Sequence, residues 1–183
     1  MTPDRTVRGH YLLETPASFF GINEVEAVLI TAAVAAIIAI WAIFSQRALV
    51  ARQTTIEFIR NSEADRDMIN ARAVFNEASR HKNGVGKWAT KPLSDEFKSI
   101  RMVLNEYELV AIAIQRGIFD DATYRRWHRS GVIQTWDHAA PFILTRRKNA
   151  NNSALWHEFE EMARWYRGGP KMPRRRFLWR KFV

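Results

Sequence analysis

The sequence predicts an all-α protein, in which one N-terminal transmembrane helix continues into a stalk and then into a small helical bundle. Four observations lead to this prediction. Residues 27–44 form an uncharged apolar run, and no Gly or Pro occurs between Gly21 and Gly84. No window of strand length alternates apolar and polar residues, so we expect no sheet. The 183 residues are 47% hydrophobic and 26% charged, which indicates a folded rather than a disordered chain.

The charge is unevenly distributed along the chain. Lys and Arg total 28 and Asp and Glu total 19, giving a net charge of +9. Residues 1–44 contain two Arg and four acidic residues, a net of −2, so residues 45–183 carry +11. The chain has no Cys, which excludes disulfide frameworks, thiolate zinc sites and Cys nucleophiles.

The apolar run AVLITAAVAAIIAIWAIF at 27–44 has a single hydroxyl group and no charge. As a helix it would be about 27 Å long, close to the roughly 30 Å of a bilayer core, and its insertion is favoured by about 3–5 kcal/mol. A buried core helix would normally carry a polar stripe, and this run has none. The apolar part of a cleaved signal peptide would follow a short basic region, whereas the region before this run is 26 residues long and net acidic. We therefore expect a signal anchor at 24–46 after a short extracytoplasmic tail at 1–23.

The arginines that flank the run predict its orientation. Arg47, Arg52 and Arg60 follow it closely, whereas Arg5 and Arg8 lie farther away on the N-terminal side. The positive-inside rule then places the N-terminus outside and the C-terminal domain in the cytoplasm.

Capping residues predict where the first helices begin. Asn23 is expected to cap the long helix, with Glu26 in the capping-box position. The helix would continue as a stalk over 47–61. Ser62 is expected to cap a second helix that ends near His81.

The cytosolic helical domain is expected at 62–169, with a loop at residues 81–92, where two Gly and one Pro occur. Ser94 is predicted to cap a helix at 95–116 that ends at Gly117. Its apolar residues fall on two sides, which favours a central position in the bundle.

The last third of the chain is expected to contain short helices. Asp120 would cap a helix at 121–130, and Gly131 would separate it from 132–140. Pro141 is expected to kink or restart the chain. A final helix is predicted at residues 154–167.

No motif assigns catalysis. His157 and Glu161 share one helical face, but a zinc-protease helix needs a second His at the position of Glu161, so a solvated face is favoured. The Gly-x-Gly pair beside Lys87 lacks the rest of a phosphate-binding loop, which favours a plain loop. We assign no catalytic residue, metal ligand or cofactor, and we expect a protein that is not an enzyme.

Three polar residues, Asn105, Glu106 and Glu108, lie within the most apolar helix. A buried carboxylate needs a partner, since burying it unpaired costs several kcal/mol. The candidate partners for Glu108 are Arg125, Arg126 and Arg146. The cluster indicates either a buried salt bridge that fixes helix packing or a polar binding pocket.

The segment LNEYELVAIAIQRGIFDDATYRRW, with TTIEFI upstream and TW…PFI downstream, resembles an uncharacterised bacterial domain-of-unknown-function family. The similarity covers about residues 54–165, and 105–117 is its most specific part. The resemblance implies one N-terminal membrane span followed by a small helical domain. It implies no activity.

The C-terminal tail, 170–183, is basic and aromatic and contains no acidic residue. It could be a soluble tail, contact anionic lipid headgroups, or bind nucleic acid through phosphate contacts. The residues predicted to make such contacts are Lys171, Arg174, Arg175, Arg176, Trp179, Arg180 and Lys181.

These observations lead to two functional hypotheses. The first is a membrane-anchored, non-enzymatic interaction or structural module with an unknown protein partner. The alternative is a tethered nucleic-acid-binding protein that uses its basic domain and tail. A helical enzyme with an unrecognised site is a weaker third possibility.

Overall fold

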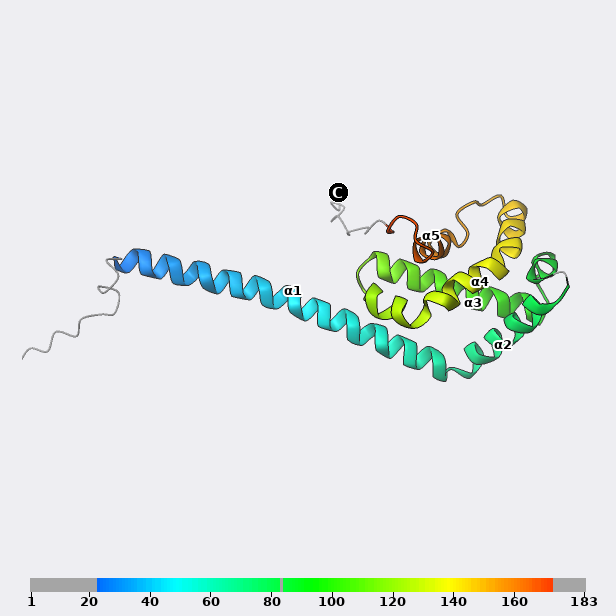
Figure 1. Cartoon of the computed structure of the whole chain (residues 1–183), viewed down its shortest axis with the longest axis horizontal. Helices are drawn as coiled ribbons and strands as arrows, with labels where there is room; N and C mark the ends of the chain where they lie inside the picture. The colour runs from blue at the N-terminus through cyan, green and yellow to red at the C-terminus, as the bar shows by residue number, and fades with distance from the viewer. Residues whose placement is uncertain (1–22, 83, 173–183) are drawn as a thin grey trace, which may run out of the picture. The chain divides into compact units, whose positions relative to one another are not determined.

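The structure is a computed structural model that describes residues 23–82 and 84–172. Over these residues it contains helices and no strand, which confirms the all-α prediction (Figure 1). The elements in chain order are α1 (Glu24–Ala64), α2 (Arg66–Arg80), the 3₁₀ helix η2 (Val85–Thr90), α3 (Asp95–Gln115), α4 (Asp121–Asn149) and α5 (His157–Tyr166). The chain divides into two units, residues 1–46 and 47–183.

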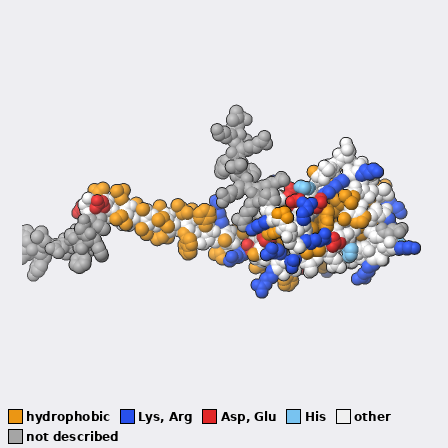
Figure 2. Space-filling view, turned by 45° about the horizontal axis from the view of Figure 1, so that its top comes forward, with side chains coloured by type: hydrophobic (Ala, Val, Ile, Leu, Met, Phe, Trp, Pro, Cys, Tyr) orange, Lys and Arg blue, Asp and Glu red, His pale blue; other side chains and the backbone are white. Residues whose placement is uncertain are grey.

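The first unit contains the N-terminal part of α1. Asn23 and Glu26 form the predicted capping box: the Glu26 N–H donates to Asn23 Oδ1 at 2.9 Å, and the Asn23 N–H donates to Glu26 Oε2 at 3.2 Å. An 18-residue window of α1 has a mean hydropathy of 2.7 and no buried residue. By length and composition this helix is a candidate membrane span, and its apolar side chains are visible in Figure 2.

In the second unit α3 packs against α2, η2, α4 and α5, as expected of a central helix. Its predicted caps are confirmed, since the Phe97 N–H donates to Ser94 Oγ at 3.1 Å and Gly117 follows the helix with φ of 72°. The core side chains that are almost fully buried come from all of these helices. They include Ile100, Leu104, Val132, Phe142, Phe159 and Met162.

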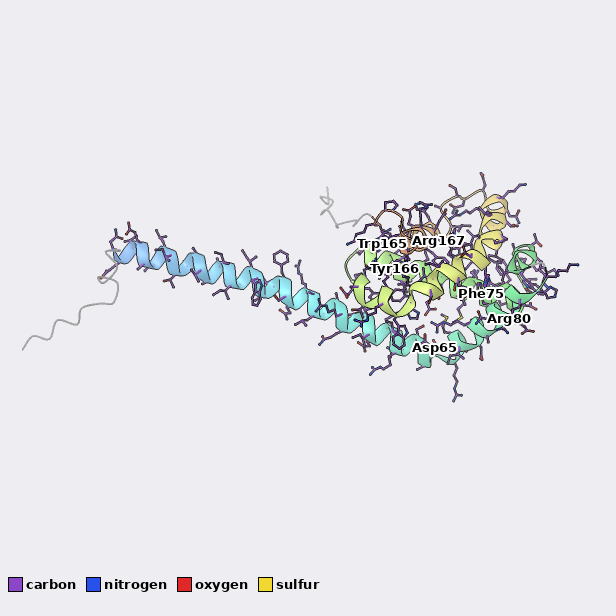
Figure 3. All side chains as sticks on the ribbon, in the orientation of Figure 1. Asp65, Phe75, Arg80, Trp165, Tyr166 and Arg167 are labelled. Atoms are coloured by element: carbon purple, nitrogen blue, oxygen red, sulfur yellow. The ribbon has the colours of Figure 1, made fainter. Side chains whose placement is uncertain are left out.

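The boundary between the stalk and α2 differs from the prediction. Ser62 lies inside α1, and Asp65 caps α2 by accepting from the Asp67 N–H at 2.8 Å (Figure 3). The predicted cap at Ser62 was therefore wrong. Its hydroxyl instead donates to the Glu106 carboxylate, a contact between residues 44 apart in sequence.

The helix α4 is longer than the sequence indicated. It begins after the predicted cap, Asp120, which accepts from the Thr123 N–H at 3.0 Å, and it then includes both Gly131 and Pro141. The separation at Gly131 and a restart at Pro141 were wrong, although α4 changes direction in its C-terminal part (Figure 1). Tertiary packing accounts for the continuity, because α4 packs against α5 and η2.

Two further segments differ from their predicted structure. The predicted loop at 81–92 contains η2, which buries Val85 and Ala89 and packs against α4. A Cβ atom on Gly86 would lie 3.1 Å from the Pro141 Cβ, so the absence of a side chain permits this approach. The last helix begins at His157 rather than residue 154, because Trp156 adopts a left-handed conformation (φ 53°).

Candidate functional site

Asn105, Glu106 and Glu108 of α3 together contact α1, α2 and the beginning of α5. Asn105 Oδ1 accepts a hydrogen bond from Trp156 Nε1 at 2.9 Å. Glu106 contacts α1 and α2, and Glu108 contacts the start of α5. The cluster therefore joins four parts of the helical domain, which supports the packing interpretation of these residues.

A salt bridge in this cluster is formed by Glu106, and not by Glu108 as expected. Its side chain is only 8% exposed, and Arg72 Nη2 lies 3.0 Å from Oε1 and 3.1 Å from Oε2. Arg72 also donates to Ser62 Oγ at 2.6 Å and to Glu63 at 3.0 Å. These bonds fix the end of α1 on α2 and α3.

Glu108 binds backbone amides instead of the predicted arginines. It accepts from the N–H of Glu158 at 3.3 Å and from the N–H of Phe159 at 2.7 Å. Over the described residues it forms no ion pair with Arg125, Arg126 or Arg146, so that prediction was wrong. Burial raises the pKa of the Glu108 carboxyl, and the two backbone hydrogen bonds partly oppose this shift.

Three ring side chains near this cluster were not predicted from the sequence: Tyr107, Tyr124 and His128. Tyr107 stacks on Phe159 with ring centroids 4.9 Å apart, and Tyr124 lies 4.7 Å from the His128 ring. Burial raises the pKa of Tyr107 and of Tyr124, and burial lowers the pKa of His128. All three shifts favour the uncharged form of the side chain.

The stalk is seated on the domain through Thr55, which is fully buried. Its hydroxyl accepts from the Asp120 N–H at 2.8 Å and donates to the Ala51 carbonyl at 2.7 Å. Beside it the rings of Phe58 and Phe119 lie 5.0 Å apart. No sequence signal marked Thr55, because its partner is 65 residues away.

Two cavities flank the cluster. One, of about 420 Å³, lies between α3, α4 and the segment before α5, with Phe97, Arg101, Asn105, Glu108, Arg146 and Trp156 in its lining. The other, of about 390 Å³, is a groove between the end of α1, α2 and α3, and we call it the α1–α3 groove. Its apolar lining residues are Phe58, Met68, Met102 and Leu109.

Of the predicted tail contacts, the structure describes only Lys171. Its ammonium group lies 5.6 Å from the ring centroid of Trp165, a residue of α5 labelled in Figure 3. The others lie outside the described residues: Arg174, Arg175, Arg176, Trp179, Arg180 and Lys181. Within the part of the chain that the structure describes, no group of three or more His, Asp or Glu side chains could hold a metal ion.

The chain matches the model of a known protein family. The family described as "Domain of unknown function (DUF4760)" matches residues 29–166, which is most of the chain. The chain belongs to this family. The DUF4760 match begins inside the apolar run and ends with α5. It therefore includes Thr55, which attaches the stalk to the helical domain, and the polar cluster on α3. No curated protein matches the chain, and no solved structure matches it.

Proposed function

We propose that this protein is a single-pass protein of the bacterial inner membrane whose cytoplasmic helical domain is a non-enzymatic interaction module. The observation that carries the proposal is the exposure of the apolar run on α1. Val28, Ile37 and Trp41 are each about two-thirds exposed, at 67%, 66% and 69%. A continuous exposed surface of this kind is unfavourable in water and favourable in lipid.

The orientation proposed is N-terminus outside and C-terminal domain in the cytoplasm, which the arginines after the run support. Alkaline phosphatase fused after Val183 is then inactive, and a fluorescent protein fused there is fluorescent. Active phosphatase together with a dark fluorescent protein contradicts this orientation.

The α1–α3 groove supports the interaction role. Its lining includes Met102, a half-buried and flexible side chain that can adapt to a partner surface, and Leu109, which is 57% exposed. We propose that a partner protein binds there through an apolar surface.

Capture of partners by detergent-solubilised full-length protein tests this role. Leu109→Glu introduces a charge into the groove and removes the partners captured by the wild type. Leu144→Glu is the matched control, because Leu144 is 62% exposed and lies outside the groove lining. Equal capture by wild type and both variants contradicts the use of the groove.

Nucleic-acid binding is the second candidate, supported by the net charge of +9. It predicts a mobility shift of DNA or RNA whose binding constant falls steeply with salt on a log–log plot. Absence of a shift at low salt rejects it.

A further inference from the structure

A third cavity, of about 310 Å³, lies between the first residues of the stalk, the α3–α4 junction and the segment after α5. We call it the junction cavity. Three basic residues of these separate segments line it, Arg47, Arg116 and Lys171, and all three are exposed. The lining also contains Ala48, Ala51, Gly117, Phe119, Asp120, Asp121 and Trp165.

The two carboxylates in the lining already have hydrogen-bond donors. Asp120 Oδ1 accepts from the Thr123 N–H at 3.0 Å and from its hydroxyl at 2.6 Å. Asp121 Oδ1 accepts from the Tyr166 hydroxyl at 3.0 Å. Within residues 23–82 and 84–172, neither Arg47 nor Arg116 forms an ion pair. The cavity therefore offers two guanidinium groups that an anion can bind.

The position of Arg47 along α1 indicates where such an anion comes from. Phe44 is the last residue of the apolar run. Arg47 lies three residues after Phe44, and Ala51 lies seven residues after Phe44. At 1.5 Å per residue these positions lie about 4–10 Å beyond the run. The headgroup layer on each side of a bilayer is about 5–7 Å thick, so Arg47 lies at the depth of lipid phosphates and Ala51 lies just beyond the layer.

We propose that the junction cavity binds the phosphate ester of an anionic phospholipid headgroup. Arg47 and Arg116 donate to the phosphate oxygens, since guanidinium groups match phosphate geometry in pairs of hydrogen bonds. Lys171 adds a third positive charge, and the volume lies in the range of small-molecule sites. The lipid source of the phosphate rests on the membrane location proposed above, whereas the phosphate site itself does not.

Titration of the full-length protein in non-ionic detergent, followed by ³¹P NMR line width, tests the site. The probes are dihexanoyl-phosphatidylglycerol, dihexanoyl-phosphatidylcholine and inorganic phosphate, each below micelle-forming concentration. The variant R47Q/R116Q removes both guanidinium groups from the cavity. The control R52Q/R126Q makes the same change of charge at one residue of α1 and one of α4, both exposed and outside the cavity lining.

The expected result is that phosphatidylglycerol binds the wild type and R52Q/R126Q within about twofold of each other. Its affinity for R47Q/R116Q is about tenfold weaker or more, since two charged hydrogen-bond donors are lost. Equal weakening in both double variants, or in neither, overturns the site. Stronger binding of inorganic phosphate than of phosphatidylglycerol overturns the lipid source and assigns the cavity to a soluble phosphate.

Carbonate extraction of the same variants separates this proposal from the membrane anchor. R47Q/R116Q remains in the membrane fraction if the anchor is correct, whatever its lipid affinity. Membrane retention together with unchanged phosphatidylglycerol binding overturns the headgroup site alone.

Discussion

The carboxylate of Glu108 on α3 accepts a hydrogen bond from the backbone N–H of Phe159 on α5 at 2.7 Å. Trp156, at the N-cap of α5, has no side-chain oxygen and makes no capping hydrogen bond. Glu108 therefore replaces the missing cap from a position 51 residues away. The same carboxylate attaches α5 to the central helix, so one residue both caps α5 and contributes to its docking.

Replacing Glu108 with Ala is expected to destabilise the domain by about 2 kcal/mol, because two backbone N–H groups lose their acceptor. Glu108→Gln keeps an oxygen acceptor and is expected to lose less. Chemical denaturation followed by near-UV circular dichroism measures both. Glu77→Ala, an exposed change on α2, is the control, and an equal loss in Glu108→Ala and Glu77→Ala contradicts the capping role.

The sequence was sufficient for features that depend on neighbouring residues. The capping box at Asn23, the caps at Ser94 and Asp120, and the end of α3 at Gly117 all arise within one helical turn. They were confirmed because local hydrogen bonds decide them.

The features that the sequence missed depend on distant residues. Glu108 was assigned an arginine partner because composition shows charges but not the open N–H groups of a helix 50 residues away. Gly131 and Pro141 were assigned to breaks because their helix propensities are poor, and packing of α4 against α5 and η2 overrides them.

Removal of Arg72 is expected to leave the Glu106 carboxylate buried without its cation. Breaking a buried pair costs about 3–5 kcal/mol, and we expect a value near or below the lower limit because Arg72 is 25% exposed. A double-mutant cycle of Arg72→Ala and Glu106→Ala should show a coupling energy above about 1 kcal/mol. Additive losses contradict the salt bridge as a packing device.

Thr55→Val is expected to weaken the attachment of the stalk to the helical domain. The substitution keeps the shape but removes the acceptor for the Asp120 N–H, which costs about 1–3 kcal/mol for a buried donor. Thr55→Ser keeps the hydroxyl and should restore most of the loss. Hydrogen exchange at the Asp120 amide is the direct measurement: unchanged protection in Thr55→Val contradicts the bond.

The pKa of His128 is lowered by burial, so the folded state disfavours its protonated form. The stability that this group contributes is present above its unfolded pKa of about 6.5, and it is lost as pH falls below that value toward the folded pKa. His128→Gln should reduce the loss of unfolding free energy between about pH 6.5 and 5. His157→Gln, at an exposed site on α5, should keep the wild-type slope. Equal slopes in all three proteins contradict the assignment.

The account depends most on the membrane location of the apolar run. The direct measurement is carbonate extraction of the full-length protein carrying Ala36→Arg and Ile37→Arg. Each arginine at the centre of a span costs about 2.5–3.5 kcal/mol, and together they cancel the gain of about 3–5 kcal/mol from the run. The control carries Leu93→Arg and Leu144→Arg, at side chains that are 88% and 62% exposed in the helical domain. If the apolar run spans the membrane, the wild type and the control stay in the membrane pellet while the Ala36→Arg/Ile37→Arg protein is soluble or degraded. Retention of that variant in the pellet, or extraction of the wild type by carbonate, would contradict it.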